Sequence, residues 1–239
     1  MLVDSEVTTL YNETRACPSS GLVAHYAFEQ DTWTGPGVII EDYSENSGGG
    51  VSAGAVADNA EGYVCQGVDI PDNNSYNIVD AINSRQDVND SMGNAGTIMF
   101  WYRAEDSWNG GGDRTLMDAT TRVIGNSNDK YFYLSKRSNS RLRFAIEDTS
   151  DSDFSIETGS NGFAGGTWVH IAVTWDMPND SMAIFVNGGL AASSTINSNG
   201  ELGDVGQVYF GDNSSSYNVP PARSAKGRLD EIRLYAGVL

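Results

Sequence analysis

Two runs of apolar residues that flank a polar turn give the clearest pattern in this chain, over residues 167–188. In the first run every second residue is apolar, which is the period of a β-strand, and this face consists of Val169, Ile171, Val173 and Trp175. The separator, residues 176–181, contains Asp, Pro, Asn and Ser, which favour turns. We therefore predict a β-hairpin. The opposite face of the first strand is also only weakly polar, so we expect a central strand with both faces covered.

Short strand-like runs separated by polar, glycine-rich segments fill most of the remaining chain. These runs lie at residues 22–28, 97–103, 114–119, 130–135, 141–147, 205–211 and 227–235. No amphipathic helix with a period of 3.6 residues stands out. Many short strands with turn signals between them are typical of a β-sandwich, so we predict an all-β fold with two antiparallel sheets.

Four of these segments, in the order in which they occur, resemble the laminin-G-like and pentraxin-like domains of the concanavalin A-like lectin and glucanase superfamily. They are GLVAHYAF at 21–28, TIMFWYR at 97–103, TWVHIAVTWD with MAIFVNG at 167–188, and GRLDEIRLY at 227–235. The resemblance implies a two-sheet antiparallel jelly-roll sandwich over residues 17–239, with residues 1–16 as an N-terminal extension. It leaves the function open, because this fold carries lectins, hydrolases, lyases and adhesion modules.

The charge of the chain argues against two classes of partner. Its 239 residues include 14 basic and 32 acidic ones, for a net charge of −18. Such an acidic surface disfavours contact with phosphates, so we expect no nucleic-acid binding and no docking on anionic membranes. No run of 18 or more apolar residues occurs, so we expect no membrane insertion. Residues 1–16 lack the basic and apolar regions of a signal peptide, so we expect any export signal to have been removed or to lie elsewhere.

Two cysteines, Cys17 and Cys65, precede and follow the first predicted strands. An even pair in a chain of this composition is compatible with one disulfide and an oxidising compartment. The alternative is two buried free thiols, because unpaired cysteine is often a core residue. With the disulfide we expect an extracytoplasmic location, either periplasmic, on the cell surface or secreted.

The predicted closing strand contains a carboxylate in an unusual place. At a period of two residues, Asp230 shares a face with Ile232 and Leu234. If that face is the core, the carboxylate must be paired, hydrogen-bonded or bound to a metal. One reading is a structural residue that accepts backbone N–H groups. The other follows from the resemblance, which implies a structural calcium held by an Asp of this strand and by an acidic residue after the opening strand, here Glu29.

A second candidate calcium segment lies at residues 42–48, with the spacing D-x-S-x-N-x-G. Oxygen-bearing side chains at alternate positions, including Asp42 and Asn46, resemble the start of a calcium-binding loop. The segment does not match an EF-hand, because Ala53 occupies the twelfth position. The alternative is an Asx turn, in which the aspartate binds its own backbone.

Four aromatic residues lie in loops rich in Gly, Asn and Asp, namely Trp33, Tyr76, Trp108 and Tyr217. An exposed ring in such a loop can stack on a sugar, with nearby Asp and Asn side chains bonding the hydroxyl groups. The alternative is that these rings cap the ends of the sandwich core, since tryptophan is highly buried on average.

Catalytic patterns find little support in the chain. Its two histidines, His25 and His170, fall within strand patterns, and the E-x-D-x-E set of the related glucanases is missing. We therefore predict a protein that is not an enzyme. We expect a recognition or adhesion module of an exported bacterial surface protein, which binds carbohydrate, is stabilised by calcium, and has a glycan or a surface protein as its partner.

The opening segment CPSSGLVAHYAFE, residues 17–29, adds a narrower resemblance. It is similar to the start of laminin-G-like domains in bacterial surface and pilus-biogenesis proteins, including those of the mannose-sensitive haemagglutinin pilus system. Two alternatives to glycan recognition remain at this point. One is a structural or protein–protein interaction module of a pilus or surface assembly, and the other is a polysaccharide hydrolase or lyase.

Overall fold

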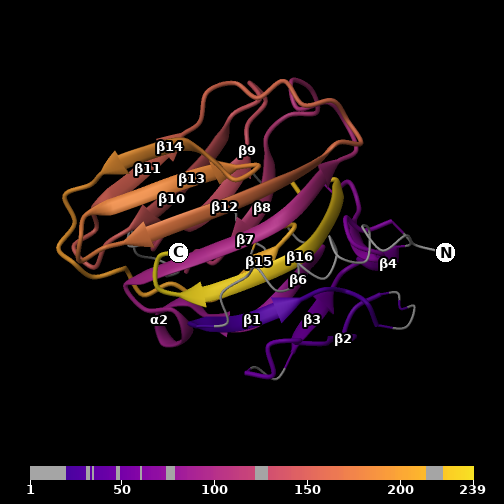
Figure 1. Cartoon of the computed structure of the whole chain (residues 1–239), viewed down its shortest axis with the longest axis horizontal. Coiled ribbons are helices and arrows are strands. Elements are labelled where there is room, and N and C mark those ends of the chain that lie inside the picture. The colour runs from indigo at the N-terminus through magenta and orange to yellow at the C-terminus, as the bar shows by residue number, and fades with distance from the viewer. Residues whose placement is uncertain are drawn as a thin grey trace, which may run out of the picture.

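The computed structural model describes residues 20–30, 33, 35–46, 49–59, 61–73, 79–121, 129–213 and 223–239. Over these residues, two antiparallel sheets of eight strands each pack into a sandwich (Figure 1). The predicted all-β, two-sheet jelly roll is therefore confirmed. The helix described is α2 (Val88–Ser91), whose N-cap Asp87 accepts hydrogen bonds from the backbone of Asn89 and Asp90. No helix in these ranges is long and apolar enough to cross a membrane.

The first sheet, called sheet A, contains the predicted hairpin. Its strands in spatial order are β14 (Gly189–Thr195), β13 (Ser181–Val186), β12 (Trp168–Asp176), β7 (Ala95–Ala104), β16 (Gly227–Ala236), β5 (Gly67–Ile70) and β4 (Ala57–Asn59), and β1 (Leu22–Tyr26) also pairs with β16. Strand β12 lies inside the sheet, as predicted. Its outer face is only partly covered, because Ala172 and Thr174 are buried whereas Trp168 and His170 are half-buried.

The second sheet, called sheet B, lies across the core from sheet A. Its strands in spatial order are β11 (Asp153–Glu157), β10 (Leu142–Glu147), β9 (Phe132–Lys136), β8 (Arg114–Asp118), β15 (Gln207–Phe210), β6 (Ala81–Asp87), β3 (Gly50–Ala53) and β2 (Ile39–Ile40). Because neighbouring strands run antiparallel, one register row can be followed from strand to strand across this sheet.

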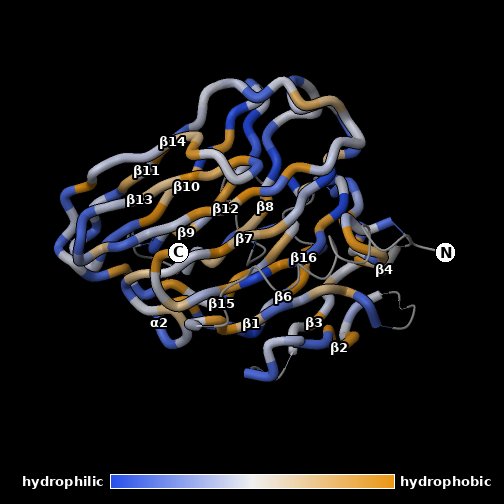
Figure 2. The backbone as a smooth tube through the Cα atoms, viewed as in Figure 1, coloured by the Kyte–Doolittle hydropathy of each residue, from blue (hydrophilic) through white to orange (hydrophobic). Residues whose placement is uncertain are grey.

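Apolar side chains from the inner faces of both sheets form the core. Along the strands of both sheets, hydrophobic positions recur between polar ones (Figure 2). The rings of Phe100 on β7 and Phe210 on β15 meet edge to face at 5.8 Å, and those of Phe132 on β9 and Trp175 on β12 meet at 5.0 Å. These contacts between sheets bury the face that the alternation of residues 169–175 predicts.

A β-bulge in β16 changes the predicted orientation of Asp230. Asp230 pairs with Trp101 and Arg233 pairs with Met99, so three steps on β16 oppose two on β7, and Glu231 adopts a left-handed φ of 51°. The strict period of two is therefore interrupted. Ile232 faces the core as predicted, but Asp230 lies on the outer face of sheet A, and the prediction that the two share a face was wrong.

Candidate functional site

The outer face of sheet B carries one continuous row of side chains. Register partners place them next to one another from β11 to β3, in the order Ser155, Ala145, Tyr133, Asp118, Tyr209, Asn83 and Val51. Buried neighbours in the same strands, such as Phe132, Leu134 and Phe210, point the other way into the core. Alternation thus places two tyrosines, a carboxylate and an amide on the outer side of the sheet, where the tyrosines and Asn83 are half-buried and Asp118 is buried.

A groove of about 260 Å³ lies at the β9–β11 end of this row. Its lining is Tyr131, Tyr133, Arg137, Arg143, Ala145, Ile146, Asp153, Phe154 and Ser155. The rings of Tyr131 and Tyr133 lie at 84° to each other with centroids 6.4 Å apart, so they present two differently oriented surfaces. Burial raises the pKa of both tyrosine hydroxyls, which therefore stay protonated and can donate hydrogen bonds at neutral pH.

The middle of the row is held by its own hydrogen bonds. Asn83 donates from Nδ2 to the hydroxyl of Tyr209 at 3.0 Å and to Oε1 of Gln207 at 3.0 Å. Asp118 pairs with both Tyr133 and Tyr209 in the register, and its carboxylate accepts the backbone N–H of Thr120 at 3.1 Å. This part of the face is therefore preorganised, with side-chain positions fixed before any ligand binds.

The groove combines the groups that recognise sugars. Aromatic rings offer apolar faces, the two arginines and the tyrosine hydroxyls donate hydrogen bonds, and Asp153 and Ser155 accept them. Glycoside hydrolysis would need two carboxylates on opposite sides of the scissile bond. Among the lining residues, Asp153 is the one with a carboxylate. The lining therefore suits binding better than hydrolysis.

Two of the predicted calcium ligands, Glu29 and Asp230, contact one loop, residues 61–66, which we call the covering loop. Asp230 accepts the backbone N–H of Val64 at 2.8 Å and that of Glu231 at 2.7 Å, and Glu29 accepts that of Gln66 at 3.3 Å. The covering loop leaves Asp230 0 % exposed although it lies on the outer face. Burial raises the pKa of Asp230 to about 8 and also raises that of Glu29.

The other two predicted ligands, Asp42 and Asn46, form hydrogen bonds between their loop and β1. The Oδ1 atom of Asp42 accepts the backbone N–H groups of His25 at 2.8 Å and Ser44 at 2.9 Å, which is the geometry of an Asx turn. Asn46 donates from Nδ2 to the carbonyl of Leu22 at 2.9 Å. These bonds support the structural alternative for this segment. In the described part of the chain, no three His, Cys, Asp or Glu side chains gather closely enough to hold a metal by themselves.

The predicted sugar-stacking tryptophans are core residues. Trp108 is 0 % exposed and packs against Tyr102 and Phe163, with ring centroids 6.1 and 5.0 Å away, and Trp33 is buried as well. Neither ring offers a face to a ligand, so the structure supports the alternative in which they cap the core. Tyr76 and Tyr217 lie outside the described residues.

The predicted disulfide is only half described. Cys17 lies outside the described residues, as does the proposed extension 1–16. Cys65 is an exposed free thiol in the covering loop. The negative charge of Glu29, followed by burial and by the charge of Asp230, raises its thiol pKa, which keeps it protonated at neutral pH. The pairing of the two cysteines stays a prediction.

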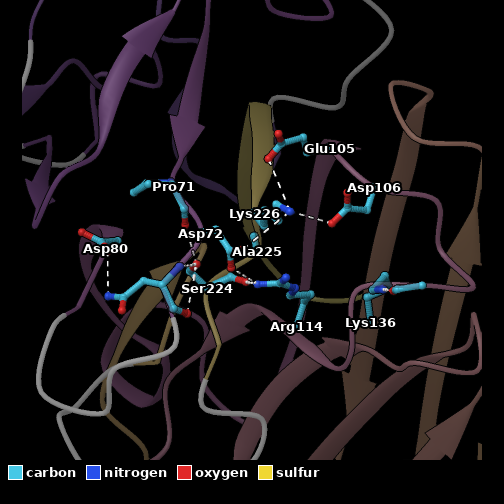
Figure 3. Close-up of polar contacts among 12 residues, drawn as sticks. Pro71, Asp72, Asp80, Glu105, Asp106, Arg114, Lys136, Ser224, Ala225 and Lys226 are labelled. Atoms are coloured by element: carbon cyan, nitrogen blue, oxygen red, sulfur yellow. Dashed lines mark hydrogen bonds and ion pairs between the residues drawn. The ribbon is translucent and has the colours of Figure 1, made fainter.

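A network of charged residues lies where β5 and β7 end and β8 and β16 begin (Figure 3). Asp72 lies between Arg114, at 2.6 Å, and Lys226, at 3.6 Å, and Lys226 also contacts Asp106 at 2.7 Å. The buried Lys136 donates to two backbone carbonyls, and burial lowers its pKa. Since these cations are bound to groups of the chain itself, we interpret the network as structural.

Hydrogen bonds also link four described residues of this region. Ser224 donates its backbone N–H to the carbonyl of Asn73 at 3.1 Å, and Asn73 donates its own N–H to Oγ of Ser224 at 2.8 Å. The backbone N–H of Asp80 in turn donates to Asp212 at 3.0 Å.

Comparison with known proteins agrees with this architecture. Residues 66–239 match a laminin G family model, described as the concanavalin A-like lectin/glucanases superfamily. The chain belongs to this superfamily. The resemblance seen in the sequence is thereby confirmed, and the superfamily match begins in the covering loop and includes strands β5 to β16. No curated protein sequence matches the chain.

Solved structures with this superfamily fold include binding domains of toxins. The binding domain of Paraclostridial Mosquitocidal Protein 1 has a TM-score of 0.64 and 17% identity, with 92% of this chain and 49% of that chain covered. The receptor binding domain of botulinum neurotoxin C/D mosaic serotype has a TM-score of 0.63 and 14% identity, with 93% and 49% covered. The Botulinum Neurotoxin Type G Receptor Binding Domain has a TM-score of 0.60 and 14% identity, with 92% and 49% covered. The chain thus spans about half of each domain, and identities this low show the fold alone.

The tyrosines of sheet B are the candidate ligand residues that the sequence analysis missed. Tyr133 and Tyr209 lie inside strands, each between two buried residues. The sequence prediction named only aromatic residues in loops. The sequence does contain a signal for outward-facing tyrosines in this sheet. In the segment Tyr131-Phe132-Tyr133-Leu134, tyrosines alternate with purely apolar residues, which places their hydroxyl groups on the face opposite the core.

Proposed function

We propose that the chain is a non-catalytic recognition module of an exported surface protein, and that it binds carbohydrate in the groove on the outer face of sheet B. The observation that carries the proposal is the register row that aligns Tyr133, Asp118, Tyr209 and Asn83 next to that groove. Rings for stacking and fixed polar groups for hydroxyl recognition are the usual elements of a pocket that orients a small polar ligand.

The comparisons support the general class of this function. The similar solved domains are described as binding or receptor-binding domains of toxins, and the superfamily includes lectins in its description. A recognition role on a bacterial surface agrees with the similarity of the opening segment to laminin-G-like domains of pilus-biogenesis proteins. An extracytoplasmic location, with the Cys17–Cys65 disulfide, belongs to the same proposal.

Truncating a groove tyrosine should remove sugar binding without unfolding the domain. We expect Tyr133→Ala to weaken the binding of a glycan identified on an array of neutral and acidic oligosaccharides by about tenfold or more, since truncating an aromatic hot-spot residue costs about 2 kcal/mol or more. Tyr43→Ala, at an exposed tyrosine of the β2–β3 region, is the matched control and should bind normally. A chain that binds no glycan on the array would favour a structural or protein-binding role instead.

We propose further that calcium stabilises the module at Glu29 and Asp230. The available ligands fit this ion in part, because calcium binds carboxylate and backbone carbonyl oxygens. In the absence of a cation, burial raises the pKa of both carboxyls. The two side chains would supply carboxylate oxygens, and backbone carbonyls or water would complete the shell. The ion would neutralise two acidic groups that approach the same loop.

Calcium should raise the melting temperature of the protein relative to the same sample in chelator, because an ion that binds only the folded state stabilises it. The Asp230→Asn variant should show no such difference. Asp42→Asn should retain it, because Asp42 serves the Asx turn. Equal melting temperatures of the unmodified protein in calcium and in chelator would reject the metal site.

A further inference from the structure

Two arginines face each other on the outer face of sheet A. Arg103 on β7 and Arg228 on β16 are direct register partners. Like charges directly opposite each other destabilise a pair of strands, so this position requires an anion between the two side chains. The chain has a net charge of −18 and only 14 basic residues, so two adjoining arginines stand out on its acidic surface.

Glu61 of the covering loop supplies an anion to both arginines in this structure, and Asp69 lies 3.5 Å from Nε of Arg228 as well. Its Oε2 atom accepts hydrogen bonds from Nη1 of Arg103 and from Nη1 of Arg228, each at 3.0 Å. The two guanidinium groups lower the pKa of Glu61. The glutamate side chain is nevertheless 68% exposed, and ion pairs this open to water contribute little to stability. A ligand carboxylate with additional contacts can therefore take its place.

A pocket of about 300 Å³ opens beside the arginine pair. Its lining is Asp69, Ile70, Pro71, Arg103, Ala104, Glu105, Gly166, Gly227 and Arg228. This volume lies at the lower end of the range for ligand sites, which suits a single small ring. A hydrogen bond holds the Arg103 side chain in position, because its Nε donates to the carbonyl of Gly166 at 2.9 Å.

Aromatic rings lie beside Arg103 on the same face, although none of them lines the pocket. Trp168 is the register partner of Arg103 on the other side, and Trp101 is the next outward residue along β7. Tyr63 stacks on Trp101 with ring centroids 3.4 Å apart and planes 11° apart, and it meets Trp168 edge on at 6.4 Å. The covering loop thus places both an anion and a ring on this surface.

We infer that Arg103 and Arg228 form a binding site for a carboxylated sugar, in which the carboxylate of a hexuronate displaces Glu61. The planar guanidinium groups bind the carboxylate through charge-assisted hydrogen bonds. Asp69 and Glu105 at the pocket wall accept hydrogen bonds from the ring hydroxyls. An acidic peptide fits less well, because it lacks the ring hydroxyls that would donate hydrogen bonds to Asp69 and Glu105.

This site is independent of the groove proposed above. The groove lies on sheet B between β9 and β11, whereas the arginine pair lies on sheet A between β7 and β16. Either site can therefore bind when the other does not, and variants of one leave the other intact. Glu61 competes with a ligand carboxylate for the two arginines. Removing the charge of Glu61 should therefore strengthen binding at this site.

The test is a calorimetric titration of the protein with tri-galacturonate, and with the same trisaccharide as its methyl ester, at low ionic strength. The acid should bind and the uncharged ester should not. Arg228→Gln should weaken binding by about tenfold or more, because a charge-assisted pair is lost. Glu61→Gln should instead strengthen it by about two- to fivefold, since an exposed ion pair no longer competes.

A matched control makes the outcome decisive. Arg141→Gln removes a charge from an exposed arginine next to β10 of sheet B, and it should leave the affinity for tri-galacturonate unchanged. Melting temperatures establish that every variant is folded, and Arg103→Gln repeats the test should Arg228→Gln fail to fold. The inference is overturned if the acid does not bind, if the ester binds equally well, if Glu61→Gln brings no gain, or if a tri-glutamate peptide binds as tightly as the sugar.

Discussion

Gly96→Ala is expected to lower the free energy of unfolding by about 3 kcal/mol, although the change adds only one methyl group. A Cβ atom at position 96 would lie 2.4 Å from two ring carbons of Trp175. That ring is fully buried, meets Phe132 at 5.0 Å and donates from Nε1 to the carbonyl of Gly93 at 3.3 Å. The close-packed core leaves it no room to move away. Alanine favours strands over glycine by at most about 1 kcal/mol, so the steric effect decides the sign.

Urea denaturation of the purified variant checks this expectation, with Gly159→Ala as the matched control. A Cβ atom at Gly159 would meet no atom within 4 Å, so that variant should unfold within about 0.5 kcal/mol of the unmodified protein. If Gly96→Ala unfolds at the same urea concentration as the control, the Trp175 ring must be able to shift, and the core at this point is looser than described.

Asp212 should contribute a component of stability that falls as the pH rises from about 4 to about 6. Burial raises the pKa of this carboxyl from 3.8 to about 6, and the nearby charges of Asp80 and Asp118 act in the same direction. In this window the folded protein keeps a proton that the unfolded chain has released, so the free energy of unfolding decreases with pH. The stabilisation is complete below pH 4, is lost as the pH passes 6, and amounts to about 3 kcal/mol.

Asp212→Asn should remove this component of the pH dependence. The amide does not ionise, so the difference in unfolding free energy between variant and unmodified protein should change by about 3 kcal/mol between pH 4 and pH 7. Asp204→Asn, at an exposed aspartate, removes the same charge and should leave the two pH profiles parallel. Urea denaturation at each pH, in chelator, gives the comparison. Parallel profiles for Asp212→Asn would show that another group carries the pH dependence.

The sequence was sufficient to predict the fold because the core strands obey a simple period. Residues 169–175 alternate without interruption, and Val169, Ile171, Val173 and Trp175 all reach the core between the sheets. The same rule was wrong at Asp230, where a single left-handed residue, Glu231, shifts the register. A bulge of this kind depends on hydrogen bonds to two neighbouring strands, so its position cannot be read from a single strand.

The candidate sites were harder to predict because they depend on register between distant strands. Tyr133 and Tyr209 are 76 positions apart in the sequence, and both lie beside Asp118 only because β9 and β15 flank β8. Arg103 and Arg228 likewise meet across β7 and β16. Strand pairing of this kind is set by the whole topology. The sequence pointed instead to aromatic residues in loops, and those that the structure describes pack in the core.

Strand β1 has a practical consequence for anyone who shortens this chain. It pairs with the second half of β16, from Ile232 to Tyr235, whereas the matched family segment starts only at residue 66. A fragment cut at that boundary would present a bare strand edge with Ile232 and Leu234 beside it, and Trp101 would lose its cover. Exposed edges of this kind recruit other strands, so the fragment should self-associate into aggregates where the longer chain stays monodisperse.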